Sequence, residues 1–154
     1  MAQTTLKVAW ERIQVLAYPR FLRTAFENLN TMLTELYPRN LAVTATTGGG
    51  TTGLITTGYN FVTVTSDSAD KQISLPAGVI GQSIDILIGA TGCELISVVA
   101  ADKVNEVTVG ATNELALTAE ALYTCKYTKS GFWIVTGETK LGARIAVLVP
   151  DALV

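Results

Sequence analysis

From residue 41 onwards, short segments of alternating apolar and polar residues are separated by turns that contain glycine. The clearest segment is 83–88, in which Ile84, Ile86 and Ile88 fall on one side of an extended chain. Because successive side chains of a strand point to opposite faces, this period of two predicts a half-buried β-strand. Many short runs of this kind predict a domain built mainly from β-structure.

We expect nine strands from these patterns. Their ranges are 61–65, 72–75, 83–88, 93–100, 106–109, 115–118, 122–127, 132–136 and 144–148. The clearest hairpin joins 122–127 to 132–136 and places Tyr123, Cys125 and Tyr127 on one face. Short strands joined by turns favour a compact antiparallel β-sandwich or barrel-like module. No long internal repeat is visible in the sequence.

The first forty residues follow a different pattern. After Pro19, apolar residues recur at the three-four spacing of one helical face, and Pro38 ends the pattern. This predicts an amphipathic helix, preceded by a shorter helix or arm. The chain as a whole is then α+β, with a helical anchor or oligomerisation segment at 1–40, a Gly/Thr-rich connector with the first strands at 41–66, and a β module at 67–154.

Composition limits the partners of the chain. Of its 154 residues 16% are charged and 49% are hydrophobic, the formal net charge is -2 and the mean hydropathy is +0.38. The low charge argues against nucleic acid as a partner. We expect no membrane span, because no apolar run approaches the roughly 20 residues that a spanning helix needs, and no secretory signal. Excess apolar surface in a small domain predicts contact with a partner subunit, and therefore a homo-oligomer.

The residues that usually carry catalysis or bind metals are sparse. The chain contains no histidine, the commonest general base and metal ligand. Cys93 and Cys125 form no CxxC unit, so we expect buried free thiols. We expect no catalytic residue, cofactor or metal site.

Two acidic pairs are candidate sites for glycoside hydrolysis or calcium binding. Asp67 with Asp70, and Asp102 with Glu106, lack the alternating oxygen-ligand spacing of a calcium loop. Aspartate is common in turns, and we therefore expect these acids to be solvated turn residues.

Two glycine-rich stretches could be mistaken for nucleotide-binding loops. The stretch 48–53 lacks the lysine of a phosphate loop and leads into a predicted strand, and the glycines of 74–92 lack dinucleotide-binding spacing. The segment 76–85 resembles a motif of dUTP nucleotidohydrolases, trimeric β proteins in which a catalytic Asp follows Gly-Val-Ile. Here that position is Gly81, so this activity is not expected.

The region from about 70 to 137 contains a longer pattern. A strand ends at Leu-Pro-Ala, a second strand follows a turn glycine, and a late hairpin carries Gly-x-Trp-x-Val. The positions are Asp70, Ile73, Leu75, Pro76, Ala77, Gly81, Ile84, Ile86, Gly89, Ala90, Asp102 and 131–137. This pattern resembles a β module of tailed-bacteriophage virion proteins, which occurs in capsid decoration proteins, head fibres and tail fibres, often as homotrimers.

The resemblance implies a structural virion protein, a capsid decoration (cement) or head-fibre protein, which is made in the bacterial host cytoplasm and placed on the outer capsid surface. Its implied partners are further copies of the chain, with a trimer favoured, and the major capsid protein. The expected capsid or subunit interface consists of Trp10, Ile13, Phe21, Phe26, Leu29 and Leu33. The alternative is a receptor- or glycan-binding module of a tail fibre, with Tyr123 and Tyr127 as candidate glycan contacts.

Overall fold

The chain divides into two compact units, residues 1–37 and 38–154. The computed structural model describes Thr24 and residues 26–29, 39–48, 53–109, 113–146 and 148–152. The described residues of the first unit, Thr24 and 26–29, are helical. The rest of the predicted helix lies outside the described residues. No helix of the described part is long and apolar enough to cross a membrane.

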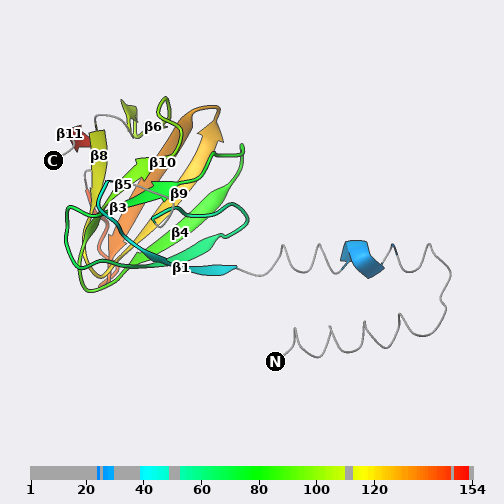
Figure 1. Ribbon diagram of the computed structural model, residues 1–154, viewed down its shortest axis with the longest axis horizontal. Coiled ribbons are helices and arrows are strands. Elements are labelled where there is room, and N and C mark those ends of the chain that lie inside the picture. Colours follow the sequence, from blue (N-terminus) through cyan, green and yellow to red (C-terminus); the bar gives the residue numbers. More distant parts are fainter. Residues whose placement is uncertain are drawn as a thin grey trace. The chain divides into compact units, whose positions relative to one another are not determined.

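The second unit contains two β-sheets (Figure 1). Its strands are β1 (Asn40–Thr44), β2 (Phe61–Thr65), β3 (Gln72–Leu75), β4 (Ser83–Ile88), β5 (Cys93–Ser97), β6 (Lys103–Val104), β7 (Val107–Thr108), β8 (Asn113–Leu117), β9 (Ala121–Lys129), β10 (Phe132–Thr139) and β11 (Asp151–Ala152). Within the described residues, the larger sheet has the order β1-β2-β4-β9-β10-β6-β7 and the smaller has the order β11-β8-β5-β3. The prediction of a mainly β protein is confirmed.

The sheets are mixed, which corrects the expectation of an antiparallel module. β1, β2 and β4 are parallel neighbours in the large sheet, and β3 and β5 are parallel in the small one. The reason is that the chain passes from the large sheet to the small one and back. Each return adds a strand beside the previous one in the same direction. Paired residues of these strands are 21 to 24 positions apart, as in Asn40 with Phe61 and Phe61 with Asp85. The first part of the unit is therefore a stack of repeated turns of chain, a structural repeat that the sequence does not display.

The two sheets enclose one hydrophobic core. Its largest fully buried side chains are Trp133, Tyr123, Ile55, Ile73, Leu75, Ile84, Ile86, Ile88, Leu95, Leu115, Val62 and Val64. The alternation at 83–88 is confirmed, since the isoleucines point into the core and Ser83 and Leu87 are exposed. Cys93 and Cys125 are buried free thiols, as expected.

Strand boundaries match the sequence patterns where alternation is regular. β2, β3 and β4 coincide with their predicted ranges. β5 stops at Ser97 rather than at residue 100, and the predicted strand at 144–148 is absent among its described residues apart from a bridge between Glu138 and Arg144. β6 and β11 are not among the predicted strands, and β1 lies in the 41–66 stretch, for which the first strands were expected without bounds.

The stretch expected to serve as a connector belongs to the β unit. Val43, Ala45 and Ile55 are buried in the core together with residues of β2. Thr46 bridges to Gln72 and Leu54 bridges to Ser74, so the chain on either side of the glycine-rich segment extends the small sheet. The described parts of this stretch therefore form the first turn of the stack.

Candidate interaction surface

Two neighbouring loops form an uncharged apolar surface at one end of the β unit. β3 and β5 are paired up to Leu75 and Ser97. The two loops that follow these strands begin side by side, since Val98 N donates to Leu75 O at 3.0 Å. The loops that follow carry exposed apolar side chains; the exposed fractions are 69% for Val79, 69% for Ile80, 50% for Val98 and 37% for Val99. We call residues 77–80 and 98–101 the apolar loop end; none of them is charged.

A buried aromatic pair lies beneath the apolar loop end. The rings of Tyr127 and Trp133 meet edge to face, with centroids 5.0 Å apart and an interplanar angle of 63°. Gly78 rests on the ring of Tyr127 so closely that a Cβ there would lie 2.2 Å from a ring carbon. Gly81 N donates to Tyr127 O at 2.9 Å, and Gly131 N donates to the Tyr127 hydroxyl. The first loop is thus held against the aromatic pair by packing and by its backbone.

Asp102 holds the second loop to the same aromatic pair. Its side chain is buried, and Oδ2 accepts hydrogen bonds from Ser97 Oγ at 2.8 Å and from Trp133 Nε1 at 3.2 Å. Its backbone N–H donates to Val99 O at 2.9 Å. A buried carboxylate is tolerated only with such partners. The expectation that Asp102 is a solvated turn acid is therefore wrong, because Trp133 is 31 positions away in the sequence and only the fold brings it to the carboxylate.

Positions that carry the resemblance to virion β modules converge at this end. Gly81, Asp102, Gly131 and Trp133 take part in hydrogen bonds at the aromatic pair or the β9–β10 turn. Leu75 O accepts the hydrogen bond that joins the end of β3 to the second loop. Gly131 has a φ of 72° and supplies the left-handed residue of that turn. These five positions thus belong to one packing network, whereas Asp70, another position of the pattern, lies in the β2–β3 loop at the opposite end of the unit.

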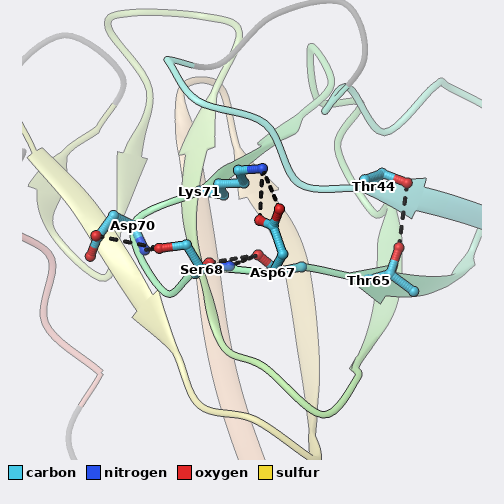
Figure 2. Close-up of polar contacts among 7 residues, drawn as sticks. Thr44, Thr65, Asp67, Ser68, Asp70 and Lys71 are labelled. Atoms are coloured by element: carbon cyan, nitrogen blue, oxygen red, sulfur yellow. Dashed lines mark hydrogen bonds and ion pairs between the residues drawn. The ribbon is translucent and has the colours of Figure 1, made fainter.

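The opposite end of the unit is polar. We call the loops 66–71, 119–120 and 139–142 the polar loop end. Lys71 Nζ lies 2.7 Å and 2.9 Å from the two carboxylate oxygens of Asp67 (Figure 2). The hydrogen bond from Lys71 lowers the pKa of Asp67. A second exposed ion pair joins Lys140 to Glu120. The two ends therefore offer different chemistry to a partner.

Buried acids lie on the small sheet, on the side away from the core. Gln72 Nε2 donates to Glu114 Oε2 at 2.6 Å, and both side chains are buried. Burial, followed by the charges of Glu114, Asp151 and Asp70, raises the pKa of Glu94 to about 7. Glu94 Oε2 has no hydrogen-bond partner among the described residues. The described residues contain no group of three His, Cys, Asp or Glu placed to hold a metal ion.

The candidate glycan contacts are not available to a ligand. Tyr123 is fully buried and Tyr127 is 7% exposed, and the Tyr123 hydroxyl accepts a hydrogen bond from Thr118 N at 2.7 Å. The alternation that places both rings on one side of β9 points them into the core. Stacking of either ring on a glycan is thus incompatible with the structure, and that expectation is corrected.

The candidate interface residues of the first unit are only partly described. Phe26 and Leu29 are helical and 39% and 49% exposed. Four others lie outside the described residues: Trp10, Ile13, Phe21 and Leu33. The apolar loop end was not predicted as a site, although the uncharged runs at 77–81 and 98–101 are visible in the sequence.

No protein-family model matches the chain, and no curated protein matches it significantly. A functional conclusion therefore rests on the residue pattern of 70–137 and on the geometry of the described residues.

Proposed function

We propose that this chain is a structural protein of a tailed-phage virion, a capsid decoration or head-fibre protein that binds the shell through non-covalent packing. The observation that carries the proposal is the packing network at the apolar loop end. It joins motif positions scattered between Leu75 and Trp133 and supports an exposed, uncharged surface. Exposed apolar patches of this kind are typical of surfaces that contact other proteins.

The two units take different parts in the proposed assembly. Residues 1–37 contact the major capsid protein or join protomers, and the β unit projects from the outer capsid surface. Phe26 and Leu29 supply exposed apolar side chains on the helical part. Each contact is small, and affinity comes from apolar burial repeated over the copies of a homo-oligomer, with a trimer favoured.

Co-sedimentation with phage particles tests this proposal. The full-length chain is mixed with particles that lack it, and the pelleted fraction is compared with that of the double variant Phe26→Asp/Leu29→Asp. The wild type should pellet with the particles and the variant should stay in the supernatant. Leu141→Asp is the control, since it places a negative charge on an exposed apolar residue of the polar loop end, away from residues 1–37 in the sequence. A wild type that never pellets contradicts the proposed function, and a double variant that pellets normally contradicts the helical anchor.

A further inference from the structure

We propose that the apolar loop end is the surface through which the β units of neighbouring copies contact one another, so that its occupant is the same surface of a second copy. This inference rests on the proposed assembly role and names the partner of the β unit. Four branched apolar side chains are exposed there, namely those of Val79, Ile80, Val98 and Val99.

The charge distribution favours an identical partner. Residues 77–80 and 98–101 carry no charge, so these loops of two copies can meet without like-charge repulsion. The exposed Lys129 of the β9–β10 turn lies at the same end and stays outside the proposed contact. At the polar loop end, by contrast, Asp67 and Lys71 are already paired with each other. A contact between two polar loop ends would have to desolvate such pairs and would gain little apolar burial.

The loops are also preorganised for binding. Gly78 packs on Tyr127, Val79 N donates to Gln82 Oε1 at 3.0 Å, and Val98 N is bonded to Leu75 O. Association therefore orders little additional backbone, which lowers its entropic cost.

The chain enters the β unit at the end where the apolar loop end lies. Asn40, Phe61 and Asp85 lie in one row across the first three strands of the large sheet, so β1, β2 and β4 begin at the same end. The loop that carries Val79 and Ile80 leads directly into β4. With strands about 4.8 Å apart, the chain enters the unit roughly 10 Å from the start of β4. Any association of residues 1–37 therefore tethers the apolar loop ends at a high effective concentration.

Site-specific cross-linking tests the contact in the full-length chain. Ile80→Cys is treated with a short bis-maleimide at neutral pH in dilute solution. The native thiols should not react, because both are buried and burial raises the pKa of Cys93 to about 12 and that of Cys125 further. Leu141→Cys is the control, since Leu141 is 88% exposed at the polar loop end. We expect covalent oligomers from Ile80→Cys and monomers from Leu141→Cys; equal yields, or none from Ile80→Cys, would overturn the inference.

Opposite charges at one position provide a second test. Ile80→Glu and Ile80→Lys should each weaken self-association at least tenfold, measured by sedimentation equilibrium, while an equal mixture should recover it through mixed pairs. Near-ultraviolet circular dichroism of the aromatic side chains checks that both variants are folded. A mixture that associates no better than either variant alone contradicts a contact between identical surfaces.

The two proposals can fail separately. A wild-type chain that pellets with particles but gives no Ile80→Cys cross-link refutes only the contact between loop ends. A chain that cross-links through Ile80→Cys but never pellets refutes the virion role and leaves the self-contact standing.

Discussion

At the scale of single residues, two carboxyl groups differ in whether their shielded oxygens have hydrogen-bond partners. Asp102 accepts two side-chain hydrogen bonds inside the packing network. Glu94 has one oxygen that is shielded from solvent and has no partner among the described residues, and it lies near further acids. Because an unpartnered buried charge is costly, these two acids should contribute to stability with opposite signs.

Asp102→Ala should lower the free energy of unfolding by about 2–4 kcal/mol, because it leaves Ser97 Oγ and Trp133 Nε1 buried without their acceptor. Urea titration followed by tryptophan fluorescence measures the change. Asp67→Ala removes an acid whose ion pair with Lys71 is exposed and should leave the midpoint within experimental error. Equal effects of the two substitutions would contradict a structural role for Asp102.

Glu94→Gln should stabilise the protein at alkaline pH and have little effect in acid. The pKa of Glu94 is about 7 in the folded chain and 4.5 in the reference state, so between these values the folded state holds the proton more tightly. Stability from this group therefore falls as pH rises from 4.5 to 7. Thermal unfolding at pH 4 and pH 8 should give similar Tm values in acid and a higher Tm for the variant at pH 8. A Tm difference that does not change with pH would count against this interpretation.

At the scale of elements, the two loops of the apolar loop end are held against the buried aromatic pair. The loop from β3 to β4 approaches the ring of Tyr127 through a glycine, and the loop from β5 to β6 is held by Asp102. Their exposed apolar tips are thus carried by ordered backbone, which is what a docking surface requires.

Gly78→Ala should destabilise the protein by about 1–3 kcal/mol, since its methyl group overlaps the Tyr127 ring and must displace either the loop or the aromatic pair. Near-ultraviolet circular dichroism should change together with the urea midpoint. Ala77→Ser alters the adjacent exposed residue and should change neither quantity. An unchanged spectrum for Gly78→Ala would show that the loop is not packed as described.

The elements also show how much of the fold can be predicted from the sequence. Period-two alternation predicted β2, β3 and β4 at their observed bounds, because it reports which side chains face the core. It carries no information on which strand lies beside which, so the parallel neighbours were missed. The strand predicted at 93–100 extended too far because Val98, Val99 and Ala100 continue an apolar run. In the fold these residues leave the sheet and are exposed.

The interaction surface could be predicted from the sequence less well than the strands could. The burial of Asp102 depends on Trp133, and that of Tyr127 on Gly78, which are contacts between segments far apart in sequence. Residue type alone favoured a solvated aspartate and left Tyr123 and Tyr127 as candidate glycan contacts in the alternative function. Their tertiary partners reverse the first expectation and exclude the second.

At the scale of the whole molecule, the β unit contains its own core. The core cluster lies within residues 38–154, and Arg39 O accepts hydrogen bonds from Asn60 N and Phe61 N. The boundary between the units is therefore nearer residue 37 than residue 40.

A chain of residues 38–154 should fold cooperatively, with a Tm within a few degrees of the full-length protein. A chain that begins at residue 46 lacks β1 and the buried Val43, exposes β2 as an edge, and should unfold at lower temperature or aggregate. Circular dichroism melting and light scattering distinguish the two. Unfolding of the 38–154 chain at room temperature would show that the first unit is needed for the core.

The stacking of chain turns in the first half of the unit has a consequence for how such a protein can change in size. Each turn adds one strand to each sheet, and paired positions recur every 21 to 24 residues. Duplication of one turn would lengthen both sheets by a single strand spacing of about 4.8 Å and conserve every inward-facing position. The architecture therefore permits growth by whole steps, whereas an insertion of a few residues would have to be accommodated within a loop.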